Sequence, residues 1–157
     1  MSTHLATYVA LAHRSEMTLA ESLRTVGQGH AQHPDVVFTC QTLATMSQAH
    51  VDRLAPVVQR YGEDDDPSVQ EPERLHAAGV GQVRSGPVGL LRDLQDLHML
   101  ASLVQSTWTV IGQAAQGLRD EELLAISTDS RADTARQLAW FTTRMKAAAP
   151  QALIVAP

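Results

Sequence analysis

The sequence predicts an all-α protein, a single domain over 1–157 built as an antiparallel bundle of four long helices. Three observations lead to this prediction. Four long segments carry apolar residues at alternating spacings of four and three, which places those residues on one face of a helix. No segment alternates apolar and polar residues as a half-buried strand does. Glycine and proline gather between the four segments, where the chain must turn.

The first two helices are predicted over about 3–28 and about 34–61. The apolar stripe of the first ends near Gly27 and Gly29, and glycine is common where helices end. The second begins at Pro34, and proline suits the first turn of a helix because the amide hydrogen it lacks has no partner there. The loop between them is short, so the two helices form a hairpin.

The third helix is predicted over about 88–117 and the fourth over about 121–149, joined by a tight turn. The connection from the second helix to the third, 63–87, has 25 residues. Helices of this length are roughly 38 Å long, so 25 residues can run back along the bundle as a crossover. The third helix would then start at the same end as the second. A short loop would instead force simple up-down-up-down order.

Composition excludes several classes of function. The net charge is −5, and the 12 lysine and arginine residues are scattered, so we expect no nucleic-acid partner. No stretch of about 18 apolar residues could span a membrane, and no signal peptide is visible, so we expect a cytoplasmic protein. Cys40 is the only cysteine, which excludes a disulfide framework. It lies on an apolar stripe and is expected to be buried.

Two polar residues interrupt the apolar stripes, Glu16 in the first helix and His50 in the second. A carboxylate that faces a bundle core is costly unless it is paired or bound to metal. Bundle cores are also where metal sites made of carboxylates and histidines are built. The other histidines have simpler interpretations, and we expect His30 and His33 in the loop between the first two helices. Trp108 is expected in the core or at a dimer interface.

The stretch AHRSEMTLAESL, followed by FTCQTLATMSQAHVDRL, resembles the first helical hairpin of the ferritin-like superfamily, nearest to rubrerythrin-type proteins. In that family the first helix carries a ligand glutamate and the second carries Glu-x-x-His. The resemblance implies Glu16 and His50 as metal ligands, with Ser47 where the second glutamate would stand. It also implies third-helix carboxylates at Asp93 and Asp96, in RDLQDLHML.

The fourth helix departs from the family pattern. Thr134 and Gln137 stand where Glu-x-x-His is expected, with Asp133 adjacent, and no histidine follows His98. A complete two-metal site needs about six protein ligands. We therefore expect at most a reduced set for iron, manganese or zinc. Its candidate ligands are Glu16, His50, Asp93 and Asp96, with Asp133 as a further candidate.

Three hypotheses follow for function. The first is a ferritin-like bundle with a degenerate metal site, which acts as a binding or structural module and not as an enzyme. The second is a metalloprotein with a reduced ligand set that handles metal or peroxide. The third is an unrelated interaction bundle in which a buried Glu-His pair sets the helix register. In each case we expect a homodimer through helix faces and the apolar C-terminal tail, 151–157, which should pack across the bundle or on a second subunit.

Overall fold

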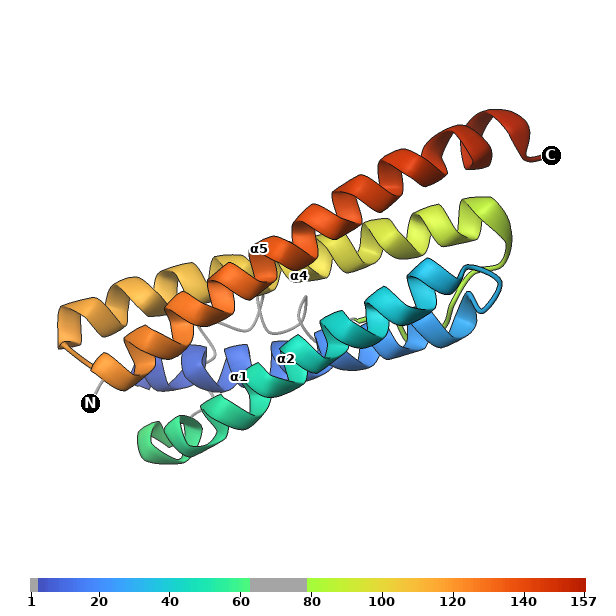
Figure 1. The fold of residues 1–157 in the computed structure, drawn as a ribbon. Coiled ribbons are helices and arrows are strands. Elements are labelled where there is room, and N and C mark those ends of the chain that lie inside the picture. Colours follow the sequence, from blue (N-terminus) through green and yellow to red (C-terminus); the bar gives the residue numbers. More distant parts are fainter. Residues whose placement is uncertain (1–2, 63–78) are drawn as a thin grey trace.

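The computed structural model describes residues 3–62 and 79–157 of the chain. These residues form four long helices and no strand, so the prediction of an all-α protein is confirmed (Figure 1). The observed bounds differ from the predicted ones by two residues at most. The helices are α1 (Thr3–Gly29), α2 (Pro34–Tyr61), α4 (Gly86–Leu118) and α5 (Glu121–Pro150), and a π-helical turn, η2 (Gln151–Val155), follows α5.

The helices begin and end where the local sequence favours it. Pro34 occupies the first turn of α2, and the helix stops at Gly62, whose φ of 85° suits glycine. The turn between α4 and α5 is closed by Arg119 in the left-handed conformation, φ 56°. The Asp120 side chain then caps α5 by accepting a hydrogen bond from the backbone amide of Leu123 at 3.1 Å.

Contacts between the helices give their directions. α1 and α2 form an antiparallel hairpin, and so do α4 and α5 (Figure 1). His30, just after α1, contacts Asp93 near the start of α4, whereas Glu16 in the middle of α1 contacts Trp108 farther along α4. α4 therefore runs opposite to α1. Because α2 also runs opposite to α1, α2 and α4 run in the same direction.

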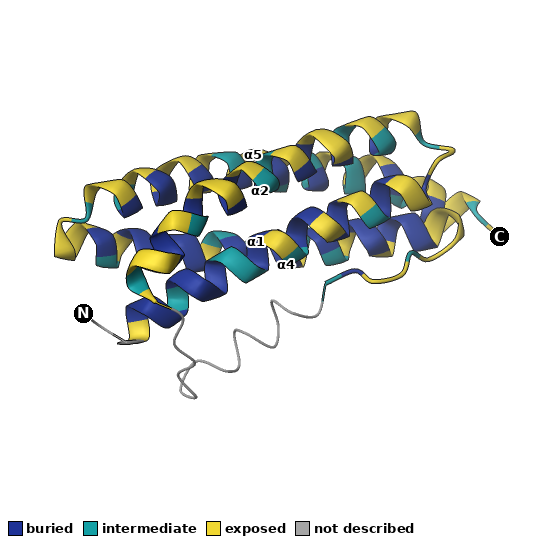
Figure 2. Ribbon diagram, turned by 90° about the horizontal axis from the view of Figure 1, so that it is seen from below, coloured by how far each residue is buried: buried dark blue, intermediate teal, exposed yellow. Residues whose placement is uncertain are grey.

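The core lies between the four helices, whose inward faces are buried along their whole length (Figure 2). Every helix contributes large side chains with less than 2 % exposure, and Cys40 is buried as expected. Burial raises the pKa of the Cys40 thiol to about 12, and the charge of Asp35 adds to this effect. The largest core side chains are Leu11, Leu19, Leu23, Leu54, Leu94, Leu97, Trp108, Ile111, Leu123, Ile126 and Phe141.

Most of the predicted crossover, residues 63–78, lies outside the described residues. Its last part, residues 79–85, runs along α1. The backbone amide of Val80 donates to the Ser22 hydroxyl at 2.9 Å, and Val83 lies directly over Gly29. This segment therefore delivers the chain to the start of α4 at the end of the bundle where α1 finishes.

The C-terminal tail does not pack across the bundle. Ala152 is buried against Leu91 and Ala148, but Leu153, Ile154 and Val155 are 68, 81 and 66 % exposed. Among the described residues, no helix has the length and apolar character needed to cross a membrane.

Candidate functional site

The centre of the bundle holds a buried pair of ionisable side chains, Glu16 from α1 and His50 from α2. Their exposures are 0 and 5 %. The Nδ1 atom of His50 lies 2.7 Å from Oε2 of Glu16, a short hydrogen bond between neighbouring helices. The sequence placed both residues on inward faces, and the structure confirms that they face the core and contact each other.

A second carboxylate holds the other side of the imidazole ring. The Nε2 atom of His50 lies 2.9 Å from Oδ2 of Asp133 on α5. Arg136, one turn farther along α5, donates to the other oxygen of Asp133 at 3.0 Å. Since both carboxylates are acceptors, the ring satisfies both only when each nitrogen carries a hydrogen, which is the imidazolium form. Burial lowers the pKa of His50, but the hydrogen bonds and charges of Glu16 and Asp133 raise it above the usual value.

α4 contributes an indole to the same group of side chains. Trp108 on α4 is fully buried, and its Nε1 donates to Oε1 of Glu16 at 3.2 Å. Both oxygens of Glu16 therefore accept a hydrogen bond inside the protein. The Glu16, His50, Asp133 and Trp108 side chains form one connected group, here called the central network, with one member from each helix.

Asp93 and Asp96, the other two predicted ligands, belong to a different cluster. Asp93 is fully buried and accepts from His30 at 2.8 Å and from the guanidinium of Arg84 at 2.8 Å. The backbone amide of Arg84 donates to it as well, at 3.0 Å. Asp96 pairs with the same guanidinium at 2.8 Å. This cluster fastens the segment 79–85 to α1 and α4.

The two clusters are far apart along the bundle. Asp93 precedes Trp108 by 15 residues on α4, about 22 Å at 1.5 Å per residue. The structure therefore brings Glu16 and His50 together but does not bring Asp93 or Asp96 to them. Trp108 lies at the level where a third-helix carboxylate was expected.

The donor geometry of the central network does not fit a two-metal site. Glu16 and Asp133 lie on opposite sides of the His50 ring, so a metal ion bound to one ring nitrogen would have only one of these carboxylates within reach. Within residues 3–62 and 79–157, no three side chains among His, Cys, Asp and Glu are grouped so that they could hold a metal ion. The network can instead hold and move a proton between a buried carboxylate and a partly exposed one, because Asp133 is 29 % exposed.

α5 carries further buried polar groups within one turn of Asp133. Gln137, at 0 % exposure, donates from Nε2 to the Ser47 hydroxyl at 2.9 Å and to the carbonyl of Leu43 at 3.0 Å. Ser47 and Gln137 are thus paired with each other at two of the positions where the family pattern has ligands. Ser130, three residues before Asp133, is also buried. Its hydroxyl and Oε1 of Gln137 have no hydrogen-bond partner in the structure.

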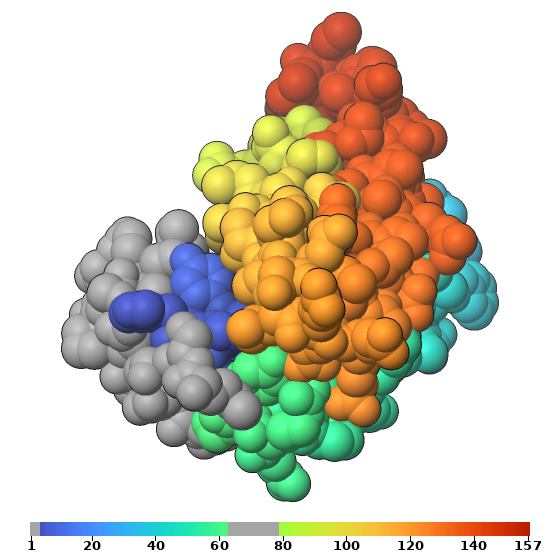
Figure 3. All heavy atoms as spheres, turned by 90° about the vertical axis from the view of Figure 1, so that its left-hand side faces the viewer, coloured from blue at the N-terminus to red at the C-terminus, as the bar shows by residue number. Residues whose placement is uncertain are grey.

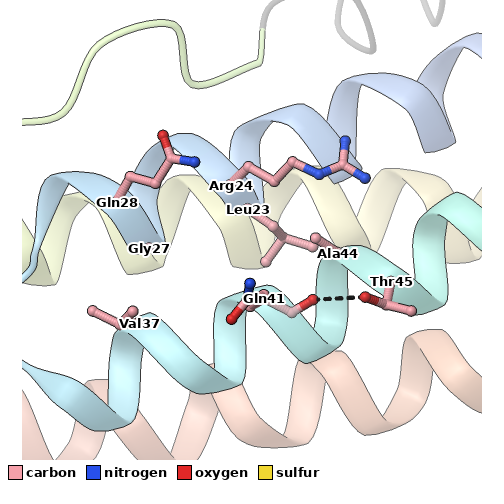
Figure 4. Close-up of a pocket in the computed structure, with 8 residues that line it drawn as sticks. All are labelled: Leu23, Arg24, Gly27, Gln28, Val37, Gln41, Ala44 and Thr45. Carbon is pink, nitrogen blue, oxygen red and sulfur yellow. Dashed lines mark hydrogen bonds between the residues drawn. The ribbon is translucent and has the colours of Figure 1, made fainter.

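A separate pocket of about 300 Å³ lies between α1 and α2 (Figure 4). The small residues Gly27 and Ala44 leave room for it. Its one ionisable lining group is Arg24, which donates to Gln48 at 3.2 Å. The pocket therefore lacks an acid-base pair. It is lined by Leu23, Arg24, Gly27, Gln28, Val37, Gln41, Ala44 and Thr45.

Sequence reasoning missed two of the buried ionic contacts. His30 was expected to be an ordinary loop histidine, but it is 1 % exposed and pairs with Asp93. The available signal was Asp93 itself, which interrupts a stripe of leucines. Asp133 was expected as a further candidate metal ligand, and its hydrogen bond to His50 was not predicted. Nothing local to Asp133 distinguishes it from the other acidic residues of α5.

Comparison of the chain with protein-family models, with curated proteins and with solved structures finds no match. What the protein does must therefore be inferred from its own residues.

Proposed function

We propose that this chain is a ferritin-like helical bundle that acts as a binding or structural module, with side-chain hydrogen bonds in the place of a metal centre. One observation carries the proposal. Both ring nitrogens of His50 are hydrogen-bonded to carboxylates, at 2.7 and 2.9 Å. The atoms that would bind metal in the family pattern are engaged with one another.

The arrangement of the helices supports the ferritin-like part of the proposal. α2 and α4 run in the same direction, so the end of α2 and the start of α4 lie at opposite ends of the bundle. Bundles of the ferritin type have one long crossover connection, whereas simple up-down bundles have none. An unrelated bundle could carry the same Glu-His pair, but it would not need this order of helices.

The central network has a structural role in this proposal. It joins α1, α2, α4 and α5 at a single level of the bundle. A helix that slid by one turn would leave Glu16 or His50 buried without its partner, which is strongly destabilising. The network therefore favours one register of the four helices over the alternatives.

We also propose that the protein is a cytoplasmic homodimer. The apolar side chains of η2, Leu153, Ile154 and Val155, are largely exposed. Phe38 on α2 and Met99 on α4 are exposed as well, at 68 and 65 %. Exposed apolar groups of this size are covered in many proteins by a second subunit.

Metal titration tests the proposed module directly. We expect the purified wild-type protein, after incubation with Fe(II), Mn(II) or Zn(II) and desalting, to retain no stoichiometric metal by elemental analysis. The Tm should not rise with metal, because a ligand that bound the folded state would raise it. His50→Gln serves as the matched variant, since it removes the imidazole and keeps a polar side chain.

One equivalent of metal in the wild-type protein that is lost in His50→Gln would overturn the proposal. The chain would then be a metalloprotein with a reduced ligand set. Metal that remains in His50→Gln would point to a site elsewhere in the chain and leave the central network without metal.

A further inference from the structure

The contacts between α2 and α5 differ in kind from those within either hairpin. Two inner contacts have been described, Asp133 with His50 and Gln137 with Ser47. Three salt bridges, of 2.6, 2.7 and 3.0 Å, join the two helices nearer the protein surface. The end of α2 meets the α4–α5 turn (Figure 3). We call this row of polar contacts the α2–α5 seam. Its outer pairs are Arg144–Asp35, Arg53–Asp129 and Arg60–Asp120.

The outer pairs of the seam are only partly buried. Arg53 and Asp129 are 46 and 62 % exposed. In each of the other two pairs one partner is largely exposed, Arg60 at 43 % and Asp35 at 57 %, while Asp120 and Arg144 are 12 and 16 % exposed. Ion pairs in water gain little net free energy, since solvent competes for both partners and salt screens them. The Arg53–Asp129 pair can therefore break and be replaced by hydration at low cost, and the exposed partners of the other two pairs are open to salt and water.

The buried face of α5 is also partly polar. Half of the buried residues of α5 are polar. Of these, Gln137 contacts α2, whereas Ser127 lies against Gly112 of α4. The backbone of α2 approaches that of α5 at far fewer places than it approaches that of α1, and Figure 1 shows the two hairpins as separate pairs. The hydrophobic effect, which scales with apolar area removed from water, therefore holds α2 to α5 less strongly than to α1.

Two buried polar atoms of α5 have no partner among the protein groups that the structure describes. They are Oγ of Ser130 and Oε1 of Gln137. The two residues are seven apart on α5, hence on one face, and Gln137 contacts α2 directly. Both atoms are free to bind water, so moving α5 away from α2 breaks no protein hydrogen bond of theirs.

We propose that the bundle opens along the α2–α5 seam, with the α1–α2 and α4–α5 hairpins remaining intact and turning about the α1–α4 contact. That contact is kept together by the buried bonds from Trp108 to Glu16 and from His30 to Asp93. Opening exposes Glu16 and His50 to solvent while both hairpins stay folded. The opening goes beyond the proposed module, which requires only the closed bundle.

Thiol labelling at three positions tests the opening. Ser130→Cys in a Cys40→Ala background reports on the seam, and it removes a hydroxyl that has no partner. Ser127→Cys in the same background reports on the α4–α5 contact, because Ser127 lies against Gly112. The native Cys40 reports on the α1–α2 contact, since it lies against Gly27. Each protein is labelled with a thiol reagent under native conditions, and rates are normalised to those in denaturant.

We expect Ser130→Cys to react at least about tenfold faster than the other two thiols, with a weaker dependence on denaturant, as sub-global opening requires. Its rate should rise further between about 0.05 and 0.5 M NaCl, because salt weakens the outer pairs. Equal rates at all three positions would show that only global unfolding exposes them. Equal rates at Ser130→Cys and Ser127→Cys, both faster than Cys40, would show that α5 detaches alone. Either result overturns the proposal.

Ser47→Cys, also in the Cys40→Ala background, gives the same readout from the α2 side of the seam. It replaces Ser130→Cys if the latter fails to give the wild-type near-UV circular dichroism spectrum. A slow rate at Ser47→Cys, equal to that of Cys40, contradicts the opening in the same way.

Discussion

Burying a charged imidazole is costly, and a carboxylate on either side of the His50 ring offsets that cost. Glu16 lies at 2.7 Å and Asp133 at 2.9 Å from the ring nitrogens, and the indole of Trp108 donates a hydrogen bond to the second oxygen of Glu16. Removing one partner from such a group leaves the others buried without compensation. The stability of the bundle should therefore respond to the protonation state of His50.

The pH dependence of stability is the prediction at the scale of one residue. Glu16 and Asp133 raise the pKa of His50 above its unfolded-state value of 6.5, even though burial opposes them. The protonated ring therefore stabilises the fold. This contribution is fully present below pH 6.5 and is lost as the pH rises through the higher folded-state pKa. We expect a loss of about 1.5–3 kcal/mol, the range for hydrogen bonds to charged groups, measured by urea unfolding at a series of pH values.

His50→Gln is the matched control, because glutamine does not titrate in this range. The difference in free energy of unfolding between the two proteins should shrink as the pH rises. A difference that stays constant from acidic to alkaline pH would contradict this account of His50.

At the scale of elements, the segment 79–85 depends on a residue without a side chain. A Cβ atom on Gly29 would lie 2.5 Å from both γ-methyl groups of Val83. Gly29 therefore allows the segment to pass close over the end of α1. Arg84 can then reach Asp93 and Asp96.

Substitution of Gly29 tests this close approach. Gly29→Ala should destabilise the protein by about 1–3 kcal/mol, the usual cost of overpacking. Val83→Ala in the same chain should recover part of the loss, because the two γ-methyl groups are removed and only the Cβ remains near. The free energies of unfolding of the wild type, Gly29→Ala, Val83→Ala and the double variant together give the coupling between the two positions.

Gly117 near the end of α4 provides the control, since nothing lies within 4 Å of a Cβ placed there. Gly117→Ala should be neutral or stabilising by up to about 1 kcal/mol, as alanine favours helix more than glycine does. Equal losses at Gly29 and Gly117 would show that helix ends in general, and not the contact with Val83, explain the effect.

At the scale of the whole molecule, the bundle presents an apolar end to solvent. η2 extends past the start of α4, and three consecutive aliphatic side chains on it are exposed (Figure 1). A second copy of the chain could cover them. Closed two-fold dimers are the commonest arrangement for soluble oligomers.

The dimer is tested by substituting the tail. The wild-type protein should sediment as a dimer at micromolar concentration, and Leu153→Ser with Ile154→Ser and Val155→Ser should shift it toward monomer. Phe38→Ser, a single exposed apolar residue on α2, should shift the equilibrium less. A wild-type monomer at all concentrations would contradict the proposed dimer.

Much of the fold could be predicted from the sequence, because helix periodicity is a local property. The stripes, the proline at the start of α2 and the glycine after it all depend on residues within one segment. Glu16 and His50 could be recognised for the same reason, since each interrupts an apolar stripe. Asp93 also interrupts an apolar stripe, but the stripe does not indicate which side chains Asp93 contacts.

The sequence by itself determined four helices, their bounds to within two residues, and two polar side chains directed at the core. The tertiary structure alone decided their partners: Asp133 and Trp108 for the Glu16–His50 pair, and His30 with Arg84 for Asp93. The physical reason is that partners are set by the relative register of helices, which depends on packing over the whole length of the bundle. Asp93 is a carboxylate like Asp133, but it lies 15 residues before Trp108 on α4, about 22 Å from the central network.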